Sequence, residues 1–161
     1  MKGAPSRSGL LQLCLLLCLA LGASAEPWSR SFQGFVQARS RGWQCLRSPE
    51  EYAQFVQGIP KQRLQQKQPA PPSTDPLLNL PEVDFSSHFL LAVWSENVHI
   101  DAHIVALRSQ GGEMHLEVQY LRPTQVEGYA APYGFGQYHL VEVPRFDGEL
   151  RVQMKEVVEV P

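Results

Sequence analysis

The chain has 161 residues and a formal net charge of −2, with 14 basic residues, 16 acidic residues and three cysteines. A chain of this length suits one domain of ordinary size that can bury a hydrophobic core. The charge balance includes no basic stripe of the kind that binds a phosphate backbone, and this excludes an obvious nucleic-acid partner.

The first 25 residues have the pattern of a secretory signal peptide. Lys2 and Arg7 supply a positive start, an apolar stretch follows at 10–21, and the small residues Ala-Ser-Ala occupy 23–25. The stretch is shorter than the roughly 20 apolar residues that a membrane-spanning helix needs. We therefore predict cleavage before Glu26, no stable membrane span afterwards, and a mature protein that is secreted or periplasmic.

The mature chain is predicted to be a single β-rich domain, residues 26–161. Without Lys2 and Arg7 it keeps 12 basic against 16 acidic residues, a net charge of −4. Cys45 is the one cysteine left after cleavage, so no disulfide framework holds the fold in an oxidising compartment. We expect Cys45 to be a small core residue, and an intermolecular disulfide is the alternative.

The first elements are two short strands at 32–38 and 43–46, followed by a helix. Ser48 is a capping serine, with proline at the first helical position and a glutamate three residues after the serine. Four apolar residues then follow at helical spacing and form one stripe. These features predict an amphipathic helix from Pro49 to about Gln57 that packs on a sheet.

Residues 61–80 are rich in glutamine and proline. Such a composition cannot bury enough apolar surface to offset the entropy of ordering the chain. We therefore predict a mobile loop or a partly extended linker. An insertion is the default interpretation, and an interaction segment is the alternative.

The apolar run from Phe89 to Trp94 predicts a buried central strand. Just before it, Asp84 is expected to be a turn residue whose carboxylate accepts backbone N–H groups two residues on. The chain after it alternates like a sheet, and its predicted strands are 99–108, 114–122, 138–143 and 150–160.

The order of these elements predicts the fold. Gly111 and Gly112 suit a two-residue hairpin turn between the strands that flank them. Several strands, one helix and no strand–helix–strand alternation indicate an α+β, mostly antiparallel β fold. We predict one N-terminal amphipathic helix packed on a meander-like sheet or small sandwich.

His99, Asp101 and His103 are spaced by two, so on one strand they would share a face. Two imidazoles and a carboxylate could hold zinc with an open position, which gives the hypothesis of a small metal-binding or metal-dependent protein. The alternative is structural: with the glycine pair as the turn, Asp101 lies opposite Arg122. His103 then lies opposite Tyr120, and a cross-strand ion pair explains the face. We favour the structural interpretation because no fourth ligand can be identified, and we expect no cofactor.

The segment 128–138 combines three glycines with four aromatic residues, Tyr129, Tyr133, Phe135 and Tyr138. Large contact groups on a pliable backbone are typical of loops that bind other proteins. We identify the four as candidate partner-binding residues. The alternative is that the aromatics cap one end of the core.

The chain has no catalytic signature. No serine occupies a nucleophile elbow, and neither a glycine-rich phosphate loop nor a paired-cysteine motif exists. We therefore expect a protein that is not an enzyme.

Several short motifs resemble those of a known family. They are Val83-Asp84-Phe85-Ser86 after a proline, the Leu-x-Val of Leu116 and Val118, Arg122-Pro123, and Tyr138-His139-Leu140-Val141-Glu142-Val143-Pro144. Over about residues 43–144 the chain resembles the C-terminal domain of the protease complex subunit PrcB family. The resemblance implies an exported, non-catalytic β-rich domain that associates with another protein, in the named example a secreted protease assembly.

Three functional hypotheses result. The first is an exported protein-interaction domain, an accessory or stabilising subunit of a secreted protease complex, whose partner is a protease or a cell-surface component. The second is the metal-dependent protein described above. The third is a protease inhibitor whose loops plug an active-site cleft.

Overall fold

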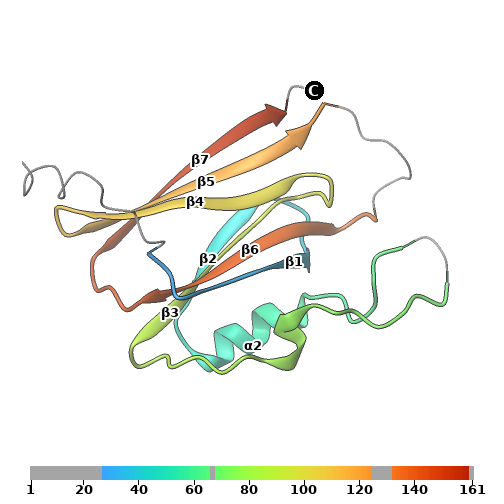
Figure 1. Cartoon of the computed structure of the whole chain (residues 1–161), viewed down its shortest axis with the longest axis horizontal. Helices are drawn as coiled ribbons and strands as arrows, with labels where there is room; N and C mark the ends of the chain where they lie inside the picture. Colours follow the sequence, from blue (N-terminus) through green and yellow to red (C-terminus); the bar gives the residue numbers. More distant parts are fainter. Residues whose placement is uncertain (1–26, 66–67, 125–131, 160–161) are drawn as a thin grey trace, which may run out of the picture.

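The computed structural model describes residues 27–65, 68–124 and 132–159, so the predicted signal peptide lies outside it. Its strands are β1 Arg30–Gln37, β2 Gly42–Leu46, β3 His88–Trp94, β4 Asp101–Gln110, β5 Glu113–Pro123, β6 Phe135–Pro144 and β7 Glu149–Glu159. The α-helix α2 Pro49–Gln57 and the 3-10 helix η1 Pro76–Asn79 lie between β2 and β3 (Figure 1). None of the helices in the described ranges is long and apolar enough to cross a membrane.

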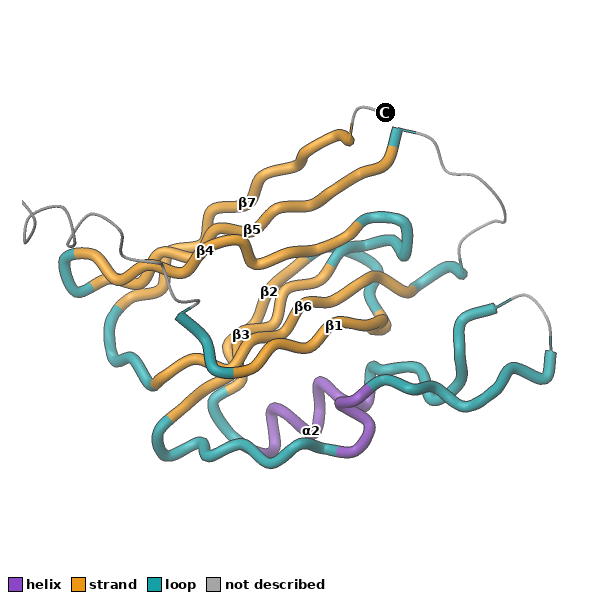
Figure 2. Tube along the Cα trace, in the orientation of Figure 1, coloured by secondary structure: helices purple, strands orange, loops and turns teal. Residues whose placement is uncertain are grey.

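The strands form two sheets in a sandwich, and α2 covers the outer face of the larger sheet (Figure 2). The larger sheet has the order β1-β6-β3-β2 and is antiparallel throughout. The smaller sheet has the order β4-β5-β7. The predicted α+β, mostly antiparallel fold is confirmed.

The connectivity differs from a simple meander, because both sheets pair strands that are not consecutive in the chain. β7 pairs with β5 in parallel, not antiparallel. A parallel pair needs a long crossover connection, and here the chain leaves the smaller sheet to form β6 in the larger one before it returns. The alternation of apolar residues indicates that β7 is a strand, but it carries no information about the direction of the neighbour.

The larger sheet is buried on both faces. Leu91 and Val93 point toward the smaller sheet, whereas Leu90 and Ala92 point toward α2. Because both faces are covered, the positions of β3 from Phe89 to Trp94 are all apolar, and this explains the uninterrupted run in the sequence. Cys45 on β2 is half-buried against the core between the sheets.

The predicted helix start is confirmed. The Ser48 hydroxyl oxygen accepts a hydrogen bond from the Glu51 N–H at 3.2 Å, and the Glu51 carboxylate accepts one from the Arg47 N–H at 2.6 Å. Tyr52 and Phe55 are buried against the sheet. The first bond satisfies a backbone donor that a helix start otherwise leaves unpaired, and the second bonds the helix to the residue before its cap.

The glutamine- and proline-rich segment contains a folded-back arm, which we define as residues 60–65 and 68–76. The Arg63 N–H donates to the Pro71 carbonyl and the Ser73 N–H donates to the Lys61 carbonyl, both at 2.9 Å. The two limbs are therefore antiparallel, and they project beyond the sandwich (Figure 1). At its base the arm continues into η1, whose Leu77 is completely buried.

Asp84 has the predicted turn role. Its Oδ1 accepts a hydrogen bond from the Ser86 N–H at 3.0 Å, and the hydroxyls of Ser86 and Ser87 also donate to the carboxylate. These bonds stabilise the ionised form and lower the pKa of Asp84 to about 2.

The hairpin between β4 and β5 turns at Gly111 and Gly112, whose φ angles are 61° and 83°, as the glycine pair predicted. A β-bulge interrupts the register between Ile104 and Ala106, where Val105 has no counterpart on β5. A bulge places one extra residue on one strand, so pairs counted from the turn are correct up to the bulge and wrong by one beyond it.

Candidate functional site

The predicted cross-strand pairs of the histidine face are wrong by one residue because of this bulge. Asp101 lies opposite Leu121, not Arg122. His103 lies opposite Gln119 and not the predicted tyrosine at 120. The hairpin therefore does not form the cross-strand ion pair that we expected.

The structure does not assemble His99, Asp101 and His103 into a ligand set either. His99 precedes β4 in a turn, where its N–H donates to the Asn97 side-chain oxygen at 2.8 Å, so it does not follow the alternation of the strand. His103 Nε2 and Asp101 Oδ2 are 3.9 Å apart. Over the described ranges, no group of three histidine, cysteine, aspartate or glutamate side chains could hold a metal ion.

His103 instead lies beside His139, with ring centroids 5.9 Å apart. His139 projects from β6 into the space between the sheets and is buried. Its Nδ1 accepts a hydrogen bond from the Ile104 N–H at 2.9 Å, and its Nε2 lies 2.9 Å from the Ser31 hydroxyl. Because Nδ1 accepts, Nε2 carries the proton of a neutral ring and donates to the serine.

The role of His139 is structural. It accepts the backbone N–H at the edge of the bulge and so bonds one sheet to the other. Burial, with a smaller contribution from the neighbouring His103, lowers the pKa of His139 to about 4. The ring therefore stays neutral at physiological pH.

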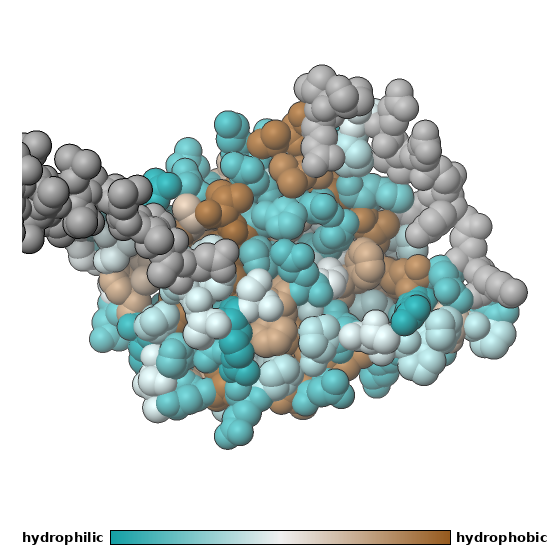
Figure 3. Space-filling model, in the orientation of Figure 1, coloured by the Kyte–Doolittle hydropathy of each residue, from teal (hydrophilic) through white to brown (hydrophobic). Residues whose placement is uncertain are grey.

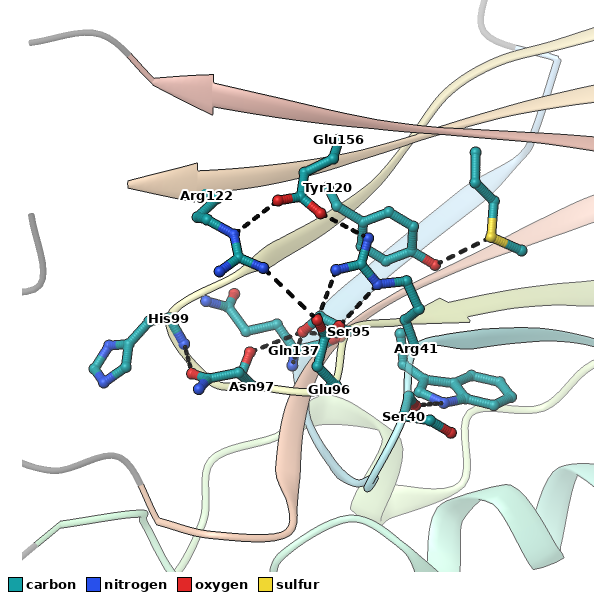
Figure 4. Close-up of polar contacts among 12 residues, drawn as sticks. Ser40, Arg41, Ser95, Glu96, Asn97, His99, Tyr120, Arg122, Gln137 and Glu156 are labelled. Atoms are coloured by element: carbon teal, nitrogen blue, oxygen red, sulfur yellow. Dashed lines mark hydrogen bonds and ion pairs between the residues drawn. The ribbon is translucent and has the colours of Figure 1, made fainter. Parts of the chain in front are cut away.

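Four charged residues form a second connection between the sheets, which we call the paired cluster: Arg41, Glu96, Arg122 and Glu156 (Figure 4). Arg41 donates to both oxygens of Glu96 at 2.6 and 3.0 Å and to Glu156 at 3.0 Å. Arg122 lies 2.8 Å from Glu156 and 4.0 Å from Glu96. The four therefore form a closed ring of alternating charge.

The ring joins distant parts of the chain. Arg41 follows β1 and stacks over the Tyr120 ring at 4.6 Å, Glu96 follows β3, and Glu156 lies on β7. The hydrogen bonds from Arg41 lower the pKa of Glu96, and the two carboxylates raise the pKa of Arg41. Since each charge is neutralised by a neighbour, the arrangement is typical of a structural brace and not of a general acid or base.

The candidate partner-binding aromatics have different surroundings. Tyr129 lies outside the described residues. Tyr133, just before β6, is 89% exposed. Phe135 is the first residue of β6 and is half-buried.

Tyr138 does not fit the role that we predicted for it, because its side chain is buried beneath α2. Its ring packs edge-on against Phe55 at 5.6 Å, and its hydroxyl donates to both oxygens of Asp75 at 2.8 and 3.0 Å. Side chains alternate along a strand, so Tyr138 faces the helix side of the sheet with Leu140. A partner protein cannot reach it there.

Asp75 holds the base of the arm against β1. Its Oδ1 also accepts a hydrogen bond from the Leu77 N–H at 3.0 Å and so caps η1. An added Cβ at Gly34 would lie 2.1 Å from Asp75 Oδ2, so only glycine leaves room for the carboxylate. Burial raises the pKa of Asp75, and the hydrogen bonds from Leu77 and Tyr138 oppose that rise.

Two adjoining hollows lie between the arm and the corner formed by β1 and β6, and together we call them the arm groove. One has a volume of about 500 Å³ and is lined by Pro60, Lys61, Gln62, Arg63, Leu64, Gln65, Gln68, Pro132 and Phe135. The other has a volume of about 350 Å³ and is lined by Gln33, Gly34, Phe35, Pro60, Gln62, Arg63, Leu64, Ser73, Thr74, Asp75 and Pro76. Four residues of the arm line both.

The surface around the arm groove is cationic and partly apolar. Lys61 and Arg63 are exposed, and neither forms an ion pair with a residue of the described ranges. Phe35 is 37% exposed, and Leu64 is half-buried. Elsewhere on the face viewed in Figure 3, hydrophobic side chains occur in separate groups among hydrophilic ones.

Sequence reasoning did not identify β1 as part of a site, and it gave the segment 61–80 an interaction role only as the alternative to an insertion. Two signals were present. The first is Gly34, a glycine inside a strand, which often marks the close approach of another group. Leu64 lies between cationic residues and glutamines in a segment otherwise poor in apolar residues. Neither signal has a meaning until the arm folds back on the sheet.

No known protein family, curated protein or solved structure matches this chain.

Proposed function

We propose that this protein is an exported, non-catalytic interaction domain that binds another exported protein through the arm groove and Tyr133. The observation that carries the proposal is Tyr133, 89% exposed, close in sequence to Pro132 and Phe135, which line the larger hollow. Tyrosine supplies a large contact area with little side-chain entropy to lose, and it is enriched at the centres of protein interfaces. The signal-peptide pattern supports export.

The chemistry of the groove supports binding over catalysis. Its charged lining residues are Lys61, Arg63 and Asp75. Asp75 already accepts hydrogen bonds from Tyr138 and Leu77, so it is committed to holding the arm. The groove thus offers cations and apolar contacts, and its one carboxylate is already bonded within the molecule.

No family model matches the chain, but the short motifs within residues 43–144 that resemble the PrcB family favour a more specific role. A small exported domain with a binding groove and no catalytic set suits an accessory or stabilising subunit of a secreted protease complex. The partner in this proposal is the protease or a cell-surface component of the same assembly.

Site-specific photocrosslinking in the native host tests the proposal. A photoreactive phenylalanine replaces Tyr133 in one variant of the full chain and Arg108 in the control. Arg108 lies on β4, away from the groove, with a side chain that is 74% exposed. We expect the Tyr133 variant to form one discrete adduct with an exported protein, and the Arg108 variant to form none.

The same adduct must depend on the aromatic side chain. Tyr133→Ser should abolish co-purification of that partner, with unchanged thermal stability because the side chain is exposed. A chain that remains solitary at both crosslinking positions contradicts the proposal. A crosslinked protease whose activity the chain blocks would instead favour the inhibitor hypothesis.

A further inference from the structure

β1 is an edge strand that pairs with β6 on one side only. The Ala38 N–H donates to the Gly134 carbonyl at 2.9 Å, in line with the β1–β6 register, so even-numbered residues of β1 bond to β6. The Gln37 N–H points the other way and donates to the Gly58 carbonyl at 2.7 Å. In an antiparallel ladder the direction alternates. Gln33 and Phe35 therefore direct their N–H and C=O groups away from β6.

These groups face the arm groove. Gln33 and Phe35 line the hollow of about 350 Å³, and the arm forms its opposite wall. Over the described part of the chain, no hydrogen bond reaches the backbone of either residue on that side. Unpaired backbone groups along a strand edge are a template for another strand.

This edge lacks the protection that sheet edges usually carry. Charged side chains discourage a second chain from pairing with an edge strand. On β7, the outer strand of the smaller sheet, the exposed residues include Glu149, Arg151 and Lys155. In contrast, residues 31–37 of β1 include no charged residue.

The chemistry of the two walls indicates what kind of strand fits. Lys61 and Arg63 on the arm have no acidic partner among the described residues. The carboxylate of Asp75 is half-buried and bonded to Tyr138. The free charge of the groove is therefore positive, and Leu64 and Phe35 add apolar contact surface.

We propose that the partner inserts an extended acidic segment into the arm groove as an additional strand on β1. The backbone of this segment bonds to Gln33 and Phe35, its carboxylates face Lys61 and Arg63, and an apolar side chain contacts Leu64. The inference rests on the proposed function and specifies the element of the partner that is recognised. Main-chain bonds would supply affinity, and the charges and the apolar contact would supply specificity.

Selection from a displayed library of random nonapeptides on the exported protein tests the inference. We expect the enriched peptides to combine acidic and apolar residues. For the tightest synthetic peptide, the double variant Lys61→Glu, Arg63→Glu should weaken binding by tenfold or more. Calorimetry measures the affinity, and amide chemical shifts of Gln33 and Phe35 report the site.

A matched pair of variants at Gln33 isolates the strand edge. Gln33→Pro removes an outward N–H without touching the bonds to β6, and proline is tolerated on edge strands in that orientation. It should weaken the peptide tenfold or more, whereas Gln33→Ala should stay within about twofold. Thermal melts establish that both variants fold. Should Gln33→Pro unfold, an N-methylated peptide tests the same bonds on the native protein.

Several results would overturn the inference: enriched peptides that are basic or neutral, no enrichment at all, or binding that neither Gln33→Pro nor N-methylation weakens. Its failure can be distinguished from that of the proposed function. A chain that crosslinks an exported partner at Tyr133 but selects no acidic strand retains the function and loses the inference. A chain that selects acidic peptides but crosslinks no partner keeps the strand-binding groove and loses the proposed function, and with it the exported partner as occupant.

Discussion

The paired cluster and the arm groove use polar groups in opposite ways. In the paired cluster, Arg41, Glu96, Arg122 and Glu156 each lie within 4.0 Å of an opposite charge. In the arm groove, by contrast, two cations and the outward backbone groups of Gln33 and Phe35 have no partner among the described residues. The first arrangement satisfies hydrogen-bonding capacity within the molecule, and the second leaves it to solvent or to another chain.

The difference shows which feature of this fold marks a binding surface. Aromatic content does not, because one of the four candidate aromatics, Tyr138, is a core residue. Charge alone does not either, because the paired cluster has more charges than the groove. Unsatisfied donors and acceptors beside a hollow are the better marker, since they gain the most when a partner arrives. Substitutions in the paired cluster should therefore affect stability, and substitutions in the arm groove should affect binding.

The largest effect should come from Gly136→Ala, which acts on the support of the paired cluster. An added Cβ would lie 1.7 Å from the Ser95 carbonyl oxygen. Ser95 and Gln137 exchange hydrogen bonds of 2.9 Å that hold the turn carrying Glu96. Relieving the overlap requires backbone movement, so we expect a loss of about 3 kcal/mol or more in the free energy of unfolding, measured in urea.

Gly111→Asn is the matched control for that substitution. The space around Gly111 is open and its φ is 61°, which asparagine tolerates better than other residues. We expect a change of less than about 1 kcal/mol. If Gly136→Ala were no more destabilising than this control, the close approach of β6 to the turn would be wrong.

His139 is a buried polar group whose two ring nitrogens both form hydrogen bonds within the molecule. The unfolded chain binds a proton near pH 6.5, but the folded chain does so only near pH 4. The unfolded state therefore gains protons first, so stability is fully present above pH 6.5 and is lost as the pH falls toward 4. Between pH 7 and 5 the loss should be about 2 kcal/mol, measured by urea denaturation at each pH.

His139→Gln should remove most of this slope, because glutamine has no proton to gain where the buried imidazole lay. His115→Gln is the control, since His115 lies on β5 with a side chain that is 42% exposed, and it should keep the original slope. Keeping measurements above pH 5 separates the histidine from carboxylates with a lowered pKa, such as Glu96. An unchanged slope in His139→Gln would contradict the assignment.

The sequence predicted features that depend on neighbouring residues. The helix start at Ser48, the turn role of Asp84 and the hairpin at Gly111 all follow from local hydrogen bonds or backbone angles. The buried central strand followed from hydrophobicity alone. These elements account for most of the fold class.

Other features required tertiary contacts that no local pattern records. Nothing in the sequence around Val105 marks a bulge, so the register beyond it was predicted wrongly. β6 is buried on both faces, so alternation could not show that Tyr138 faces α2. The arm groove depends on Asp75 packing on Gly34, two residues that lie far apart in the sequence.

The smallest predicted effect comes from the paired cluster itself. Arg41→Met removes the bonds to Glu96 and Glu156 but keeps an apolar stem over Tyr120. We expect a loss of about 1–2 kcal/mol, because the cluster is only partly buried and its charges are partly screened. Arg108→Met, which breaks an exposed pair with Glu117 at 3.6 Å, should cost less than about 0.5 kcal/mol.

Substitutions in the paired cluster should change stability alone, and substitutions in the arm groove should change binding alone. Arg41→Met should leave the affinity for the selected acidic peptide unchanged, because the paired cluster does not line the groove. The Lys61→Glu, Arg63→Glu variant should weaken the peptide and leave the free energy of unfolding unchanged, since both side chains are exposed and have no described ion pair. If Lys61→Glu, Arg63→Glu lowered the free energy of unfolding, the cations of the groove would be part of the structural network. If Arg41→Met weakened the peptide, the paired cluster would contribute to binding. In either case unsatisfied charge would no longer distinguish the binding surface.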